Sequence, residues 1–125
     1  MTKEDFHRYI DHFNHKRYEK MVPFYADDVE VDLAGIALKA PQEIVSFYRD
    51  FHQYVREFLE VKYAAVDETG VAVELYSEFD CFRDYPDARL SFKRGDVRRL
   101  LNFVHYDLHN GQFKRIRVAR YKQYP

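Results

Sequence analysis

The sequence has 125 residues, the length of one ordinary domain, and 46% of them are hydrophobic and 18% aromatic. This apolar content excludes a disordered chain, and a net charge of -1 excludes a protein that is strongly acidic or basic throughout. No apolar run approaches the roughly 20 residues that cross a bilayer, and the N-terminus has no signal-peptide core, so we expect one cytoplasmic domain over residues 1–125 with no membrane partner.

The single cysteine and the basic C-terminal part exclude further classes of function. Cys81 has no internal disulfide partner, and the alternating run around it predicts a small buried thiol rather than a nucleophile. Residues 97–125 contain seven Lys or Arg and one acidic residue, Asp107. Because these charges alternate with apolar residues, we interpret them as a solvated sheet face or an oligomer contact, and we expect no nucleic-acid partner.

The first residues predict two helical segments. Thr2 with Asp5 three positions later has the pattern of a capping box, and an amphipathic helix is expected over residues 3–16. A second, short helical segment over 18–25 contains Pro23, which either sits in its first turns or breaks it. The apolar stripe of the first helix consists of Phe6, Tyr9, Ile10 and Phe13.

A strand and a third helix are predicted next. Apolar and acidic residues alternate over 29–33, which indicates a strand that ends at Gly35. Pro41 is placed to begin a helix, because its missing N–H costs nothing in the first turn. The apolar stripe of this helix is Ile44, Phe47, Tyr48, Phe51 and Val55.

From residue 58 onward the apolar period changes to two, which predicts a sheet. Asp67–Gly70 and Asn110–Gly111 are turn sequences, and Asn-Gly favours a tight hairpin. Residues 83–96, with Pro86 and Gly95, form either a long loop or a strand with an irregular approach. Helices followed by a mostly antiparallel sheet predict the α+β class. The expected strands are 58–66, 70–82, 97–108 and 113–121.

Tyr9 and Asp32 are titratable residues on or near apolar stripes. Proton transfer beside a carbonyl requires a base in a dry pocket and a donor aimed at the oxygen where negative charge develops. An aspartate on the pocket side of a strand and a tyrosine on the inward face of a helix could supply both. Alternatively, Tyr9 is a core residue whose hydroxyl bonds to a neighbour, and Asp32 faces solvent or caps the following turn.

Two groups of residues have spacings that could suit a metal ion. His7, Asp11 and His15 follow one side of the first helix, but this side lies away from the apolar stripe. The second group ends at a hairpin, where ligands would be poorly held. We therefore expect no metal site, and without a phosphate loop or nucleotide fingerprint we expect no cofactor. The second group is His105, Asp107 and His109.

The order of elements and several motifs together resemble the nuclear-transport-factor-2-like superfamily, which includes ketosteroid isomerase and SnoaL-like polyketide cyclases. The likeness covers almost the whole chain. Phe24–Asp28, an aromatic pair before Ala-Asp-Asp, and the following Val29–Gly35 resemble one family signature, and Asn110–Val118 resembles the family's final hairpin. The resemblance implies a curved sheet wrapped as a cone around the helices, an apolar pocket at the open end and, usually, a homodimer built on the sheet.

Ketosteroid isomerase offers the nearest residue-level match. Arg8-Tyr9-Ile10 before Asn14 resembles the run that carries its oxyanion-hole tyrosine, so the resemblance assigns that role to Tyr9. Asp32-Leu33-Ala34-Gly35 resembles the turn that its general-base aspartate opens, although this strand is one residue shorter. Its protonated aspartate falls on Val104, so identical steroid chemistry is not expected. Scytalone dehydratase, whose helix tyrosine would fall on Phe13, fits less well.

The correspondence at Val104 implies that Asn102 and Tyr106 face the pocket and His105 faces outward, while a one-residue slip would make His105 a candidate acid or base.

We expect a cofactor-independent isomerase, cyclase or dehydratase acting on a hydrophobic carbonyl compound. The alternative is a non-catalytic ligand-binding or dimerisation module of the same fold. The candidate catalytic residues are Asp32, Tyr9 and His105, and the expected pocket residues are Phe13, Tyr48, Phe51, Asn102 and Tyr106.

Overall fold

The computed structural model describes residues 1–33 and 35–125, so Ala34, in the expected turn after Asp32, lies outside the described residues. The helices are α1 (Lys3–Asn14), α2 (Tyr18–Met21), the short 3₁₀-helix η1 (Val22–Phe24) and α3 (Pro41–Phe51). The strands are β1 (Tyr25–Leu33), β2 (Ile36–Lys39), β3 (Val55–Val66), β4 (Gly70–Cys81), β5 (Val97–His109) and β6 (Gln112–Tyr124).

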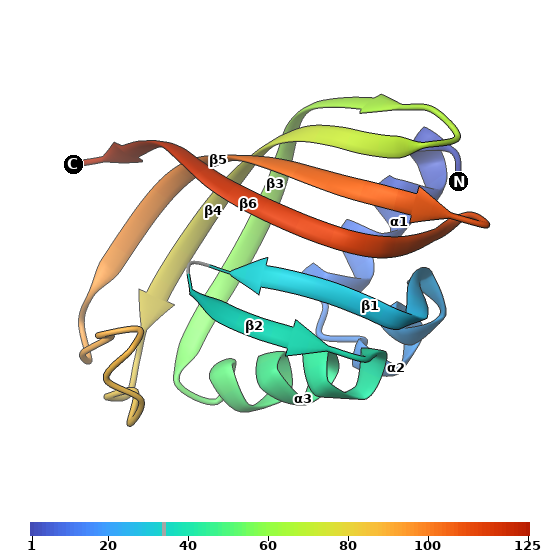
Figure 1. The fold of residues 1–125 in the computed structure, drawn as a ribbon. Coiled ribbons are helices and arrows are strands. Elements are labelled where there is room, and N and C mark those ends of the chain that lie inside the picture. Colours follow the sequence, from blue (N-terminus) through green and yellow to red (C-terminus); the bar gives the residue numbers. More distant parts are fainter. Residues whose placement is uncertain (34) are drawn as a thin grey trace.

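The strands form one mixed sheet in the order β2-β1-β6-β5-β4-β3. Neighbouring strands are antiparallel except β1 and β6, which run parallel. The long strands bend over α1, and α3 lies along the other end of the open sheet, beside β2 (Figure 1). The predicted α+β cone is therefore confirmed, and its concave face is the one that the helices cover.

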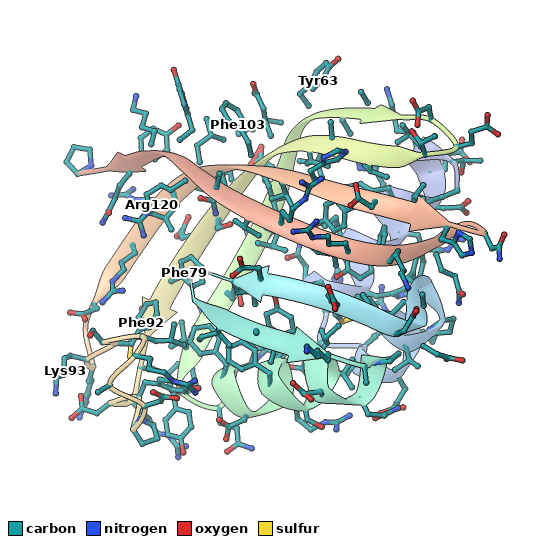
Figure 2. All side chains as sticks on the ribbon, viewed as in Figure 1. Tyr63, Phe79, Phe92, Lys93, Phe103 and Arg120 are labelled. Carbon is teal, nitrogen blue, oxygen red and sulfur yellow. The ribbon has the colours of Figure 1, made fainter. Side chains whose placement is uncertain are left out.

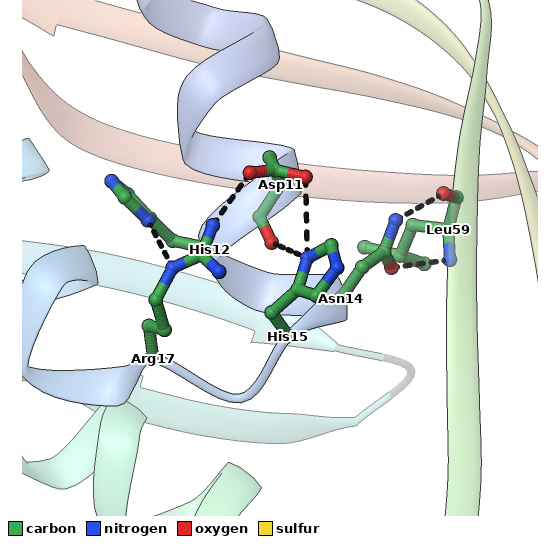
Figure 3. Close-up of polar contacts among 6 residues, drawn as sticks. All are labelled: Asp11, His12, Asn14, His15, Arg17 and Leu59. Atoms are coloured by element: carbon green, nitrogen blue, oxygen red, sulfur yellow. Dashed lines mark hydrogen bonds and ion pairs between the residues drawn. The ribbon is translucent and has the colours of Figure 1, made fainter.

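Local sequence explains where α1 begins and how it is held. The Thr2 hydroxyl accepts a hydrogen bond from the Asp5 amide at 3.0 Å, and the Asp5 carboxylate accepts one from the Thr2 amide at 2.9 Å, which confirms the capping box. The helix ends at Asn14, two residues before the predicted end. The Asn14 side chain donates to the carbonyl of Leu59 and accepts from its amide, which fastens α1 to β3 (Figure 3).

The hairpin between β5 and β6 follows directly from its sequence. Asn110 and Gly111 have φ angles of 51° and 75°, and a two-residue turn with both angles positive matches the twist of the flanking strands. The long partner strands that this turn joins pair from Arg99–Tyr124 to His109–Gln112. The predicted hairpin is therefore confirmed, and both strands extend further than expected.

Several elements differ from the prediction. β1 begins at Tyr25 rather than at residue 29, and the four-residue β2 was not predicted. Val55 belongs to β3 and not to the stripe of α3, which ends at Phe51. Between β4 and β5 the chain forms a loop, and Cys81 at its start is buried as expected.

The core lies between the helices and the concave face of the sheet. The four apolar residues of the α1 stripe are all buried there, against residues such as Val71 and Phe113 of the sheet. No helix within the described residues is both long enough and apolar enough to span a membrane. The apolar stripe of α1 thus packs against the sheet of the same molecule. The candidate site is the space that remains between the helices and the sheet.

Candidate functional site

A cavity of about 330 Å³ lies between the helices and the concave face of the sheet. This volume lies at the lower end of the range of small-molecule sites, which are typically about 300–1,000 Å³. Most of the lining is aromatic and aliphatic. The structure places all five expected pocket residues in this lining, namely Phe13, Tyr48, Phe51, Asn102 and Tyr106. Their role in binding a substrate stays a prediction.

Tyr9 also lines the cavity, but its hydroxyl already has a protein partner. The hydroxyls of Tyr9 and Tyr25 lie 2.6 Å apart, and the two rings meet edge to face. Both side chains are buried, and burial is the main cause that raises the pKa of each well above its ordinary value. The pair therefore stays protonated at neutral pH and forms a polar contact at the wall of the cavity.

The hydroxyls of Tyr48 and Tyr106 are different, because neither forms a hydrogen bond with another described residue. No buried side-chain nitrogen or oxygen among the described residues lacks a partner, so these two hydroxyls must reach accessible space, and both residues line the cavity. Burial raises the pKa of both tyrosines. Tyr48 and Tyr106 can therefore donate hydrogen bonds to a bound molecule.

A buried carboxylate, Glu57 on β3, completes the polar groups of the cavity. Its side chain is 8% exposed and its Oε1 lies 3.0 Å from Nε2 of His52, whose side chain is 2% exposed. Nδ1 of His52 lies 2.6 Å from the hydroxyl of Tyr18, and burial raises the pKa of Tyr18 to about 12. Because a carboxylate only accepts, Nε2–H donates to Glu57, and in the neutral imidazole Nδ1 accepts from Tyr18.

The second oxygen of Glu57, Oε2, accepts no hydrogen bond from the other described residues. Since no buried polar side-chain atom in this part of the chain is unpartnered, Oε2 has access to the cavity that Glu57 lines. The charge of Glu57 is felt by the tyrosines around it, because after burial it is the next cause that raises the pKa of Tyr48. The site thus joins one oriented carboxylate with two available hydroxyl donors.

The prediction that Asp32 lies on the pocket side of its strand is wrong. Val29 and Val31 of β1 are buried and Val31 and Leu33 line the cavity, whereas Asp32 between them is exposed. Successive residues of a strand face opposite sides, so Asp32 points away from the cavity and does not meet Tyr9. This strand is one residue shorter than the strand it resembles in ketosteroid isomerase. The shift of one residue places Leu33, and not the Asp32 carboxylate, on the inner face.

His105 is not in the cavity either. Its side chain is 53% exposed on the outer face of β5, and Nδ1 lies 2.9 Å from an Arg117 nitrogen. Asn102, Val104 and Tyr106 of the same strand face the helices, as the correspondence at Val104 implied. The alternative register that would make His105 an acid or base is therefore excluded.

The two groups with metal-like spacing form ordinary surface contacts. Asp11 on α1 pairs with Arg17 at 2.5 Å and with His15 at 3.2 Å (Figure 3). On the outer face of β5, Asp107 lies 3.3 Å from Arg117. Within residues 1–33 and 35–125, no cluster of three or more His, Cys, Asp or Glu is placed to hold a metal ion.

Glu57 and His52 were missed by the sequence analysis, although a signal was present. Val55, Leu59 and Val61 alternate along β3, and Glu57 stands in the same period. If β3 begins at Val55, Glu57 takes a position in this apolar stripe, and its carboxylate faces the core. Because the strand was expected to begin at residue 58, Glu57 was placed outside the sheet.

No protein-family model matches the sequence, and no curated protein matches it. A candidate polyketide cyclase from Silicibacter sp. TM1040 has a similar structure, with a TM-score of 0.78 and 20% identity over 94% of this chain and 87% of that one. A candidate polyketide cyclase from Xanthomonas campestris pv. campestris has a TM-score of 0.74 and 24% identity over 88% and 82%.

A third similar structure is a hypothetical protein with a ketosteroid isomerase-like fold from Catenulispora acidiphila DSM 44928, in complex with trimethylamine. Its TM-score is 0.75, with 8% identity over 95% of this chain and 86% of that one. At these identities the likeness establishes the fold. The chain has the cone fold shared by SnoaL-like polyketide cyclases and ketosteroid isomerase-like proteins, as the sequence resemblance implied.

Proposed function

We propose that the chain is a cofactor-independent enzyme that isomerises, cyclises or dehydrates a hydrophobic carbonyl compound. The observation that carries this proposal is the Glu57 carboxylate, which is oriented by His52 on one oxygen and open to the cavity on the other. A base, an orienting partner and nearby donors in a largely apolar pocket are what enolisation requires. That candidate polyketide cyclases share the fold adds support to this class of reaction.

In this mechanism Oε2 of Glu57 removes a proton from the carbon beside the substrate carbonyl. The electrons of that C–H bond form a new C=C bond and the π electrons of the carbonyl move to its oxygen, where the hydroxyls of Tyr48 and Tyr106 donate hydrogen bonds to the developing negative charge. Glu57, now protonated, returns the proton to another carbon or to a leaving hydroxyl. His52 and Tyr18 are positioning residues, which hold Oε1 and leave Oε2 free.

The first test is a thermal-shift screen of hydrophobic ketones and polyketide-like compounds, followed by assays of turnover for each compound that stabilises the protein. With a substrate in hand, Glu57→Gln should lower kcat by about 10²–10⁴-fold, the usual contribution of a general base. Glu60→Gln is the matched control, because Glu60 is an exposed acid of the same strand paired with Lys62.

Two outcomes would contradict the catalytic proposal. If Glu57→Gln retained turnover, Glu57 would not be the base. If compounds bound in the cavity and none was converted, the alternative function, a ligand-binding module of the same fold, would be favoured instead.

We also propose that the chain forms a homodimer through the outer face of the sheet. Large apolar side chains are exposed there: Phe103 is 42% exposed, Tyr121 is 65% exposed and Tyr63 is 60% exposed. The rings of Phe103 and Tyr121 lie 4.9 Å apart, and Phe103 and Tyr63 project away from the helices in Figure 2. A cluster of this kind is typical of an interaction surface.

A further inference from the structure

The inward-facing residues in the middle of β4 are apolar except at one position. Ser77 stands in the same alternation as its apolar neighbours and is only 2% exposed. A hydroxyl group therefore interrupts an apolar stripe on the concave face of the sheet. The other members of this stripe are Val71, Val73, Leu75 and Phe79, the last of which is labelled in Figure 2.

The hydroxyl of Ser77 forms no hydrogen bond with another described residue. Since every buried polar side-chain atom in the described part of the chain has a partner, this oxygen is open to the cavity that Ser77 lines. A hydroxyl without a partner on an apolar wall contributes nothing to the fold, because alanine would occupy the position with no polar group to satisfy. A bound molecule accounts for this serine, whereas the packing of the protein does not.

Asn102 provides a second neutral polar group beside Ser77. Ser77 pairs in register with Leu100 of β5, and Asn102 is two residues further along that strand, on the same face. Such diagonal neighbours lie about 7–8 Å apart, a gap that one oxygen atom can bridge with two hydrogen bonds of about 2.8 Å. The amide of Asn102 forms no hydrogen bond with another described residue, and Asn102 also lines the cavity. The two side chains can thus hold one ligand atom between them.

The chemistry of these two side chains favours one kind of ligand group. A serine hydroxyl and an asparagine amide each donate and accept hydrogen bonds, and neither carries a charge. A hydroxyl group of a ligand also donates and accepts, so it can satisfy both side chains at once. A carbonyl oxygen only accepts, and a carboxylate or an ammonium group would need a charged partner to be held in an apolar wall.

Ser77 is also a diagonal neighbour of the proposed base. Glu57 of β3 pairs in register with Phe79 of β4, and Ser77 is two residues from Phe79 on the same face. The backbones of Glu57 and Ser77 are therefore about 7–8 Å apart. A ligand hydroxyl held by Ser77 lies within a few bonds of the carbon that Glu57 would deprotonate.

We propose that Ser77 and Asn102 form a subsite for a hydroxyl group of the substrate, so that the substrate class is a hydrophobic hydroxy ketone. This inference rests on the proposed function, because it assigns the carbonyl end of the molecule to Glu57 and the tyrosines. Ser77 and Asn102 determine specificity and take no part in the proton transfer. A ketone without the hydroxyl leaves both polar groups unpaired in the filled cavity, which lowers its affinity.

The test uses 4-hydroxy-4-phenylbutan-2-one and 4-phenylbutan-2-one, two ketones that differ by one hydroxyl group. Isothermal titration calorimetry at neutral pH should show the hydroxy ketone binding about tenfold more tightly. This preference should fall in Ser77→Ala and in Asn102→Ala. Ser46→Ala is the matched control, because Ser46 is exposed on α3 and does not line the cavity. In urea denaturation without ligand, Ser77→Ala should be at least as stable as the wild type, since its hydroxyl has no partner among the described residues.

Equal binding of the two ketones, binding of neither, or a preference that survives in Ser77→Ala would overturn the inference. An equal loss of affinity for both ketones in Ser77→Ala would indicate a packing role and would overturn it too. Glu57→Gln separates this result from the catalytic proposal, since that variant should keep the preference for the hydroxy ketone while it loses turnover of a substrate. Loss of turnover without that preference would refute the hydroxyl subsite alone. The preference with turnover intact in Glu57→Gln would refute the base alone.

Discussion

The two faces of the sheet carry similar residues, but the environments of those side chains differ. Glu57 on β3 and Asp32 on β1 are both strand carboxylates, but Glu57 lies against the cavity with a histidine on one oxygen, whereas Asp32 is exposed to solvent. On β5, Tyr106 is buried and His105, the residue directly before it in the chain, is exposed on the outer face. Residue type therefore does not identify a functional group in this fold; the face of the strand does.

The largest effect expected from this difference is on stability at high pH. The four tyrosines that line the cavity, Tyr9, Tyr25, Tyr48 and Tyr106, have pKa values raised by burial, and Tyr18 has its pKa raised to about 12. Below pH ~10 these hydroxyls are protonated in both the folded and the unfolded chain, and their stabilising effect is complete. As the pH rises further, only the unfolded chain ionises, so the free energy of unfolding should fall.

Urea denaturation across this pH range measures the slope. Tyr106→Phe should make the slope shallower, because it removes a hydroxyl with a raised pKa from the inner face. Tyr121→Phe, which removes a hydroxyl that is exposed on the outer face, should leave the slope unchanged. An equal change in both variants would mean that the two faces do not differ in this respect.

A smaller effect is expected at the pair of hydroxyls formed by Tyr9 and Tyr25. Tyr9→Phe leaves the Tyr25 hydroxyl without its partner at 2.6 Å, and Tyr25→Phe leaves the Tyr9 hydroxyl without its partner. Each single variant should lose about 1–3 kcal/mol of unfolding free energy, while the double variant should lose less than the sum. Chemical denaturation of the four proteins gives the coupling energy directly, and additive losses would show that the contact does not stabilise the fold.

On the outer face, Phe103→Glu should weaken the proposed homodimer. A carboxylate buried in that interface would be costly, so the dissociation constant should rise at least about tenfold. Sedimentation velocity over a range of protein concentrations measures it. Glu68→Gln, a change in the exposed turn between β3 and β4, is a control that should be nearly neutral. If the wild-type protein were monomeric at micromolar concentration, the dimer proposal would be wrong.

The smallest effect is expected at Asp32. Its carboxylate is exposed and outside the cavity, so Asp32→Asn should change the unfolding free energy by no more than about 0.5 kcal/mol and should leave turnover intact. The same denaturation and activity assays as for Glu57→Gln measure both. A large loss of turnover would mean that the carboxylate reaches the substrate after all.

Much of the fold could be predicted because its signals are local. The Thr2–Asp5 cap, the stripe of α1 and the Asn110–Gly111 turn each depend on residues a few positions apart, and each is present as expected. β2 was missed because four residues with two buried positions carry little periodic signal. Such a short strand exists because β1 pairs with it, which is information that its own sequence does not contain.

The site could be predicted in outline, but its base could not be identified by motif. The spacing from Gly35 back to Asp32 resembled a known turn, yet the alternation of Val29, Val31 and Leu33 already put Asp32 on the opposite face. Glu57 needed the correct start of β3, which depends on where α3 ends. Where a distant resemblance and the local periodicity disagree, the periodicity is the better guide to the face on which a side chain lies. A strand that is one residue shorter moves every following side chain to the opposite face.

The parallel contact between β1 and β6 has a consequence for the order in which the molecule is assembled. β1 and β2 are attached to the rest of the sheet only through β6, whose residues are the last to be synthesised of all the strands. A nascent chain on the ribosome can form the β3–β4 hairpin early, but β1 and β2, which form one wall of the cavity, cannot join the sheet until β6 has been synthesised. Binding competence should therefore arise in a single late step, as β6 docks between β5, which directly precedes it, and β1, which was made long before it.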